Sequence, residues 1–431
     1  MTDIHPFNIL VPQDKINTLQ TKLSLATFPD ELPSESASAW DQGPPLSEIQ
    51  RLTEKWKTWN WRNVENSLNE YPQFTTKIDV EGFGELDIHF LHQESPVKNA
   101  IPLLFVHGWP GSFLEVLKIL PHLQSPAAST SSPHPSFHIV APSLPNFGFS
   151  SGVKKRGFAM AQYAETLNKL MIKLGYSEYV TQAGDWGFWI TRAIGKLYPK
   201  HCKASHLNMV YAQPPKLFSN PIEKIGDMFM PYSELEKRAV ERRKWFQAES
   251  RGYNVLQSTK PQTLAYGLAD SPVALLGWIY EKLHDWSDEY PWSDDEILTW
   301  VSVYYFSTAG PGTPQRIYYE TMHTSKDKEC TVDKLQQWTA DVKLGLAYNP
   351  KDLENVPKRW GRTLGNVVYE VENDSGGRVW HFLLNKDCAA NHSDRHFYSH
   401  EKPDLLVRDL RAMFGKGGKA FSIVQGRDGY E

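Results

Sequence analysis

The sequence predicts an α/β fold in which a mostly parallel central sheet carries a helical cap. Three observations support this prediction. Strand patterns alternate with helix patterns from residue 101 to about 211, as in right-handed parallel α/β units. The segment 101–106 is apolar almost throughout, which is typical of a strand buried on both faces. From about 214 to 323 the alternation gives way to a helical pattern, and strand patterns resume at 344–348.

The overall composition is that of an ordinary globular protein. The chain has 431 residues and a formal net charge of -4, a weak negative balance that gives no sign of nucleic-acid or membrane-surface binding. Its 3 cysteines form no CxxC motif, and no His pair has ligand spacing. We therefore expect no disulfide framework, no metal and no cofactor.

Two further features bear on location and assembly. The N-terminal residues lack a continuous apolar segment, and no run of about 18 apolar residues follows. These features predict a soluble cytoplasmic protein without a signal peptide or a transmembrane segment. The sequence is compatible with a homodimer and does not decide the oligomeric state.

Residues 1 to about 70 have the pattern of amphipathic helices. After Pro12, apolar residues recur on one helix face, at Ile16, Leu19, Leu23 and Ala26. A second helix is expected to begin at Ser47, because Ser47 and Gln50 have the spacing of a capping box. Its apolar face carries Ile49, Leu52, Trp56 and Trp59. The Pro- and Ser-rich connection 28–45 indicates a wrapping arm rather than an independent domain.

The core elements follow in chain order. Segments 74–80 and 86–91 alternate around two glycines and predict an antiparallel hairpin. Further strands are expected at 101–106, 137–141, 179–183, 207–211, 344–348 and 367–371. Helices are expected at 114–120, 163–174 and 190–197, with a closing helix at 405–413. The low-complexity segment 125–136 is expected to be a surface loop.

The turn at 183–187 carries the strongest functional signal. Ala183-Gly184-Asp185-Trp186-Gly187 lies between a strand pattern and a helix pattern, and small residues flank Asp185 on both sides. This is the form of a nucleophile elbow, with Asp where ester hydrolases have Ser. The turn is tight, so larger side chains would collide with the neighbouring strand and helix. Asp185 is therefore the expected nucleophile.

Two further residues follow in the order of an α/β-hydrolase: Asp352 after the strand 344–348, and His396 after the strand 367–371. They are the expected acid and base. The turn His107-Gly108-Trp109-Pro110 can aim the backbone N–H of Trp109 at the elbow. Together with the N–H of Trp186 it would form an oxyanion hole. His107 itself is expected to be a turn residue rather than a base.

The whole chain resembles an epoxide hydrolase of the microsomal type, in its soluble fungal form. The resemblance rests on an ordered set of motifs, among them HGWPGS at 107–112, Pro142-Ser143-Leu144-Pro145, GDWG at 184–187, Trp278-Ile-Tyr-Glu-Lys282, Pro350-Lys-Asp352 and His396-Phe397 with Glu401 and Pro403. It implies an α/β-hydrolase fold: a mostly parallel central sheet with helices on both faces, a helical cap and an N-terminal wrapping arm.

The resemblance also implies a reaction. The substrate would be a small-molecule epoxide and the product a vicinal diol. A carboxylate such as Asp185 is ionised at pH 7 without a base and attacks an epoxide carbon. By similarity, Tyr253 and Tyr318 would protonate the leaving oxygen, with Tyr319 as the rival of Tyr318. His396, oriented by Asp352, would then activate the water that hydrolyses the ester.

Some assignments have competitors. Glu370, Glu372 and Asp374 compete with Asp352 for the acid, although they lie on or after the last strand, where the base should follow. His381 competes with His396 but lacks the Glu and Pro that follow His396. Two other functions stay open: a haloalkane dehalogenase-like hydrolase, and a catalytically impaired or non-catalytic binding protein of the same fold.

The expected division of the chain is an arm with the first strands (1–95), the first part of the core (96–213), the cap (214–325) and the second part of the core (326–431). The chain departs from the family pattern in three places. Asn146 replaces a usual Gly, and Asn349 stands where an aromatic residue is expected. An insert at 378–395 precedes His396, and we expect it either to loop out or to misplace the base.

Overall fold

The computed structural model describes residues 3–32, 39–124, 133–287, 290–326, 328–349, 352–373 and 396–430. Within these ranges a nine-stranded sheet has the order β1-β2-β3-β5-β4-β6-β7-β8-β9. β1 (Ile4–Pro6), β2 (Gln73–Val80) and β3 (Gly84–Gln93) are antiparallel, and β3 pairs antiparallel with β5 (Phe137–Pro142). In the order of the sheet, β5 and all the strands that follow it are parallel to one another. These following strands are β4 (Ile101–Val106), β6 (Tyr179–Ala183), β7 (Cys202–Leu207), β8 (Thr339–Tyr348) and β9 (Gly365–Glu372).

The sheet is covered on both faces, as the apolar pattern of β4 predicts. Leu104 and Val106 pack into one cluster of buried side chains, while Leu103 and Phe105 pack into another. Successive side chains of a strand point to opposite faces, so one apolar strand supplies two cores. The first face carries α5 (Met160–Lys173) and α6 (Trp186–Leu197). The second carries α4 (Leu120–Leu123) and α17 (Pro403–Phe414).

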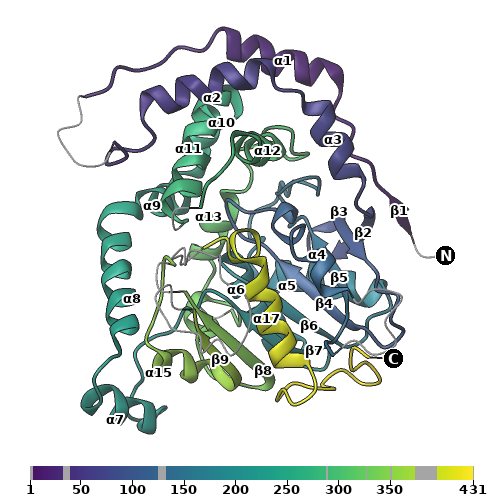
Figure 1. Cartoon of the computed structure of the whole chain (residues 1–431), viewed down its shortest axis with the longest axis vertical. Coiled ribbons are helices and arrows are strands. Elements are labelled where there is room, and N and C mark those ends of the chain that lie inside the picture. Colours follow the sequence, from purple (N-terminus) through teal and green to yellow (C-terminus); the bar gives the residue numbers. More distant parts are fainter. Residues whose placement is uncertain are drawn as a thin grey trace, which may run out of the picture.

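Of the helices between β7 and β8, most form a cap beside the carboxyl ends of the parallel strands, whereas α7 (Pro221–Phe229) lies apart from them, beside α15 (Lys358–Gly361) (Figure 1). The helices of the cap are α8 (Glu234–Trp245), α9 (Gly252–Thr259), α10 (Pro261–Asp270), α11 (Pro272–Asp285), α12 (Asp294–Tyr305) and α13 (Arg316–Met322). Shorter helices follow: α14 (Val332–Leu335), α15 and α16 (Tyr398–Glu401).

The N-terminal arm lies across this cap rather than forming a unit of its own. It contains α1 (Gln13–Ser24), α2 (Leu46–Thr58) and α3 (Trp61–Asn69). Figure 1 shows α1 and α2 running over α10, α11 and α12, and α1 and α2 both contact α11. The indole N–H of Trp56 donates to the hydroxyl of Ser302 on α12 at 3.2 Å. The apolar faces of the arm are thus covered by the cap.

Three predictions about individual elements are wrong. In place of one helix at 114–120, a 3-10 helix at Phe113–Val116 is followed by the short α4. The second helix of the arm begins at Leu46 and not at Ser47, and no capping side chain bonds its first turn. Glu31 instead accepts the free N–H of Leu46 at 2.9 Å, so this donor needs no capping box.

The strand predicted at 207–211 is β7, Cys202–Leu207. Pairing with β6 fixes its register: Ala183 lies opposite Leu207, and both strands end at the same edge of the sheet. The polar side chains within β7 conceal this strand in the sequence.

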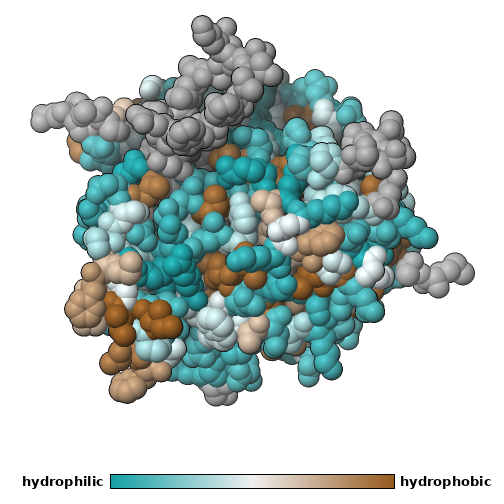
Figure 2. Space-filling view, turned by 60° about the horizontal axis from the view of Figure 1, so that its bottom comes forward, coloured by the Kyte–Doolittle hydropathy of each residue, from teal (hydrophilic) through white to brown (hydrophobic). Residues whose placement is uncertain are grey.

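The surface carries one feature that the sequence analysis did not single out. Near α7, Figure 2 shows a cluster of apolar residues, and the exposed side chains there are Leu217, Phe218, Ile222, Ile225, Met228, Phe229 and Met230. Monomeric proteins rarely expose so many neighbouring apolar side chains. Within the described ranges, none of the helices is both long and apolar enough to cross a lipid bilayer.

Candidate active site

Asp185 lies on a strained turn between β6 and α6. Its φ of 48° and ψ of -128° are uncommon for a residue other than Gly, as expected for a nucleophile elbow. Gly184 and Gly187 are required because a side chain at either position would collide with neighbouring atoms. A Cβ on Gly187 would lie 2.2 Å from the carbonyl oxygen of Val106, and one on Gly184 would lie 2.6 Å from Nδ2 of Asn208. The packing around the turn therefore demands the small residues seen in the sequence.

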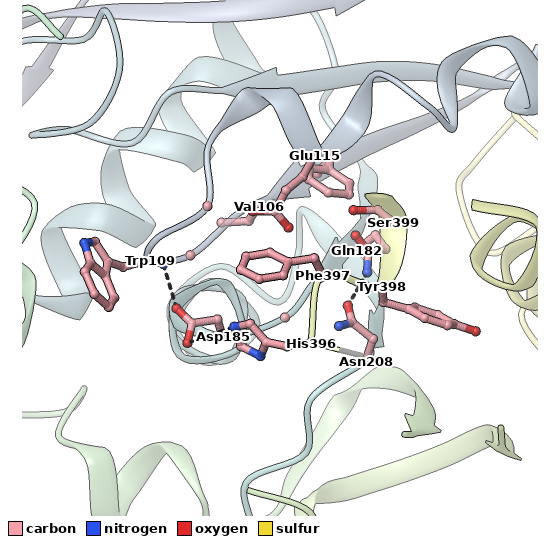
Figure 3. Close-up of a pocket in the computed structure, with 14 residues that line it drawn as sticks. Val106, Trp109, Glu115, Gln182, Asp185, Asn208, His396, Phe397, Tyr398 and Ser399 are labelled. Atoms are coloured by element: carbon pink, nitrogen blue, oxygen red, sulfur yellow. Dashed lines mark hydrogen bonds and ion pairs between the residues drawn. The ribbon is translucent and has the colours of Figure 1, made fainter. Parts of the chain in front are cut away.

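The carboxylate of Asp185 is held by backbone donors. The N–H of Trp109 donates to Oδ1 at 2.8 Å (Figure 3). Burial raises the pKa of Asp185, while His396 and the N–H groups of Trp109 and Trp186 oppose this rise. Gly108 permits the approach, because a Cβ there would lie 2.1 Å from Oδ1. Both N–H groups expected for the oxyanion hole therefore face the carboxyl group of Asp185.

His396 joins Asp185 to Asp352. Its Nδ1 lies 2.9 Å from Oδ1 of Asp352, and its Nε2 lies 3.9 Å from Oδ2 of Asp185. Burial lowers the pKa of His396, but the charge and hydrogen bond of Asp352, followed by the charge of Asp185, outweigh burial. The net effect raises the pKa above 6.5. The three residues expected as nucleophile, acid and base thus lie side by side.

The loop that carries Asp352 is fixed by Asn349. The side-chain Nδ2 of Asn349 donates to the carbonyl of Asn208 at 3.1 Å, and its Oδ1 accepts from Nδ2 of Asn373 at 2.9 Å. The backbone carbonyl of Asn349 accepts from the N–H of Asp352 at 2.9 Å. An amide at position 349 therefore ties the acid loop to the ends of β7 and β9, which explains this departure from the family pattern.

The cap places a group of buried aromatic side chains around the elbow. The ring of Tyr318 packs edge-on against Trp186 at 4.7 Å, and that of Tyr253 stacks on Trp109 at 5.3 Å. The two tyrosine rings lie 6.0 Å apart. Burial raises the pKa of both hydroxyls well above the usual value, with a further contribution from Asp185. Trp286 completes the group against Tyr253 at 5.1 Å.

Three of the rivals for these roles are engaged elsewhere. Tyr319 is half-buried and stacks on His323 at 3.9 Å, and it does not line the cavity at Asp185. Glu370 binds Arg362, and Glu372 lies 2.9 Å from the ammonium of Lys358. Asp374, His381 and the insert 378–395 lie outside the described residues.

The structure explains the turn residue His107 and also Asn146, which stands where the family usually has Gly. His107 is buried, its Nδ1 lies 2.9 Å from the carbonyl of Gly108, and its Nε2 accepts from the N–H of Leu144. Burial lowers its pKa to about 4, so the ring is neutral and acts within the turn. Asn146 has a φ of 75°, the left-handed conformation in which Gly is usual and Asn is tolerated.

Asp185 lies between two cavities. The larger has a volume of about 340 Å³ and is lined by Tyr253 and Tyr318 and by side chains of α8 and the following turn. The smaller, shown in Figure 3, is lined by Asp185, His396, Glu115, Gln182 and Asn208 among others. Within the described residues, Asp185 is the only residue that lines both.

The sequence analysis missed Glu115 and Gln182. Glu115 interrupts the apolar series 113–117 three residues after Ser112, the spacing of a capping box. The hydroxyl of Ser112 accepts from the N–H of Leu114, while the carboxyl group of Glu115 accepts from the backbone N–H of Ser112 and lines the site. An acidic residue inside an apolar series was the available signal. In the part of the chain described, no group of three or more His, Cys, Asp or Glu residues could hold a metal ion.

Comparisons with known proteins agree with this geometry. Residues 4–116 match the family model described as "Epoxide hydrolase N terminus", and residues 101–246 match that of the "alpha/beta hydrolase fold". Epoxide hydrolase 1 of Sus scrofa is 32% identical over 433 residues, which cover 96% of this chain and 88% of that protein. The chain belongs to the epoxide hydrolase family.

Solved structures of this family share the architecture. The epoxide hydrolase of Aspergillus niger superposes with a TM-score of 0.76 at 30% identity and covers 94% of each chain. The juvenile hormone epoxide hydrolase of Bombyx mori gives a TM-score of 0.78 at 26% identity, covering 95% of this chain and 93% of that one. The family thus extends over the arm, the core and the cap, and the α/β-hydrolase fold expected from the sequence is confirmed.

Proposed function

We propose that the protein hydrolyses small-molecule epoxides to vicinal diols through a covalent ester on Asp185. One observation carries the proposal. The N–H of Trp109 holds Oδ1 of Asp185, Oδ2 lies 3.9 Å from Nε2 of His396, and Asp185 lines the same cavity as Tyr253 and Tyr318. Membership of the epoxide hydrolase family supports it and disfavours the dehalogenase-like alternative.

In the first step, Oδ2 of Asp185 forms a bond to an epoxide carbon while a C–O bond of the ring breaks. The departing oxygen is too basic to leave as an alkoxide, so it takes a proton from Tyr253 or Tyr318. The raised pKa values keep both hydroxyls protonated at neutral pH. Their buried position removes competition from water for the hydrogen bond.

In the second step, water adds to the ester carbon of Asp185 and gives a proton to Nε2 of His396. Oδ1 then carries the negative charge, and the N–H groups of Trp109 and Trp186 stabilise it. The intermediate collapses when the ester C–O bond breaks and the leaving oxygen takes the proton from His396. The proton left on the Asp185 carboxyl group restores the ionised tyrosine, so the diol is released without net change in the enzyme.

The remaining sequence-based expectations stay predictions. They are the cytoplasmic location, the homodimer and the four-part division at residues 95, 213 and 325. A small-molecule epoxide as the partner follows from the proposed reaction.

Styrene oxide and the purified protein test the proposal. We expect diol formation by the parent and none by Asp185→Ala. One turnover of the parent in 18O-water should place the label in Asp185, because water adds to the ester carbon. A parent that releases no diol, or one that labels only the diol in a single turnover, would contradict this mechanism.

A further inference from the structure

The smaller cavity beside Asp185 is built to hold one polar molecule. It has about 10 Å³ of space for the centre of a water-sized sphere, which is room for about one water molecule. His396, Glu115 and Gln182 line it together with Asp185 (Figure 3). The tyrosines of the cap line the other cavity. Substrate and water would therefore reach the carboxyl group of Asp185 from different sides.

We propose that Gln182 and Glu115 bind the water that hydrolyses the ester on Asp185, and that they orient it together with His396. This inference rests on the function proposed above. It adds two water-binding residues to the second step only, since neither side chain lines the cavity that holds the tyrosines. Both residues should consequently matter for ester hydrolysis and not for ester formation.

Gln182 supplies an acceptor with no other partner. Its side chain is 1% exposed, and its Nε2 donates to Oδ1 of Asn208 at 2.7 Å. This bond fixes the amide, and within the described residues Oε1 has no hydrogen-bond partner. Buried polar atoms are rarely left unpaired, and a water molecule is the usual partner where a cavity has room for it. Gln182 lines a cavity of this kind.

Glu115 is held against the same cavity by a close approach to the backbone. A Cβ on Gly111 would lie 1.8 Å from Oε1 of Glu115, so the carboxyl group fills the space that a side chain at 111 would take. Burial raises the pKa of Glu115 to about 8; His396 lowers it, and the charge of Asp185 adds to the rise. At neutral pH the group is mostly uncharged and does not repel the oxyanion that forms on Asp185.

These positions give the water a defined orientation. One O–H donates to Nε2 of His396, which takes the proton. The other O–H needs an acceptor, and Oε1 of Gln182 provides one. Glu115 limits the remaining movement of the water, so that its free lone pair faces the ester carbon. A misplacement of about 1 Å at such a site can cost about 10²-fold in rate.

Single-turnover kinetics with styrene oxide separate the two steps. Tryptophan fluorescence follows ester formation, and intact-protein mass spectrometry of quenched samples follows the decay of the ester. We expect Glu115→Leu and Gln182→Leu to form the ester within about twofold of the parental rate and to hydrolyse it at least about tenfold more slowly. Glu115→Gln keeps a hydrogen-bonding group of the same shape and should stay close to the parent.

A separate variant leaves every polar group in place. Gly111→Ala puts a methyl group where the Glu115 carboxyl lies, and it should also slow decay of the ester more than its formation. Circular dichroism checks that each variant is folded. The inference is overturned, and the proposed function is not, if Glu115→Leu and Gln182→Leu hydrolyse the ester at the parental rate. The same holds if the rates of ester formation and ester hydrolysis fall equally. If neither the parent nor the His396→Ala variant, which should trap the ester, forms any ester, both the proposed function and this inference are overturned.

Discussion

Nδ1 of His396 lies 2.9 Å from Oδ1 of Asp352, a residue 44 positions earlier in the chain. An ionised carboxylate only accepts hydrogen bonds, so Nδ1 carries the proton of the neutral imidazole. Nε2 is then an acceptor, and it is the nitrogen that faces Oδ2 of Asp185 at 3.9 Å. Asp352 thereby selects the form of His396 that can take a proton from water.

This relationship predicts the effect of Asp352→Asn on the pH dependence of ester hydrolysis. A protonated His396 cannot act as a base, so in the parent hydrolysis rises with pH through a pKa above 6.5. Asp352 is the main group that raises this pKa. Its replacement should move the acidic limb to lower pH and slow hydrolysis by at least about 10²-fold. Ester decay, measured across the acidic and neutral range, checks both effects. An unmoved limb would show that Asp352 does not control the titration.

The two tyrosines predict a defect confined to the first step. Tyr253→Phe and Tyr318→Phe should each slow ester formation by about 10²-fold or less, because the second hydroxyl can still protonate the oxygen. The double variant should nearly abolish it. Stopped-flow tryptophan fluorescence measures the step, and Tyr319→Phe is the matched control with parental kinetics. Parental ester formation by both single variants would show that other groups act as acids, and halide release from a haloalkane should then be measured.

The close approach of Gly108 to Asp185 predicts that a larger side chain at position 108 lowers activity by steric collision with the carboxylate. In Gly108→Ala the added Cβ would lie 2.1 Å from Oδ1 of Asp185, so the carboxylate must move away from the N–H of Trp109. We expect turnover to fall by about 10²- to 10³-fold in a folded protein, the effect of losing one oxyanion donor. Gly267→Ala, on the exposed face of α10 with no atom within 4 Å of the new Cβ, is the control. A Gly108→Ala variant with parental turnover would mean that the carboxylate needs no fixed donor.

Asn146 predicts a difference in stability between two substitutions. Its Oδ1 accepts from the N–H of Val153 at 2.7 Å, and its Nδ2 donates to the hydroxyl of Tyr163 at 3.1 Å. Asn146→Gly loses these bonds and should lower the free energy of unfolding by about 1 to 3 kcal/mol. Asn146→Ala also strains the backbone at φ 75° and should cost about 1 kcal/mol more. Urea unfolding measures both, and equal stabilities of the two variants would exclude backbone strain at this position.

Much of the fold and the nucleophile could be predicted from local sequence. Both sides of the strand 101–106 are apolar, which requires helices on both faces of the sheet. The small residues around Asp185 follow from contacts within one tight turn, so the elbow is visible in five consecutive residues. The order of Asp185, Asp352 and His396 gave the expected roles because each follows a strand that ends at the same edge of the sheet.

Only the tertiary structure decided which side chains share the two cavities. Glu115 and Gln182 lie far apart in the chain, and they line the same cavity because β4 and β6 are neighbours in the sheet. The amide of Asn349 looked like a departure until its bonds to Asn208 and Asn373 were seen. Hydrogen bonds and close contacts between distant segments depend on how the strands are ordered, and this order leaves no periodic pattern in the sequence.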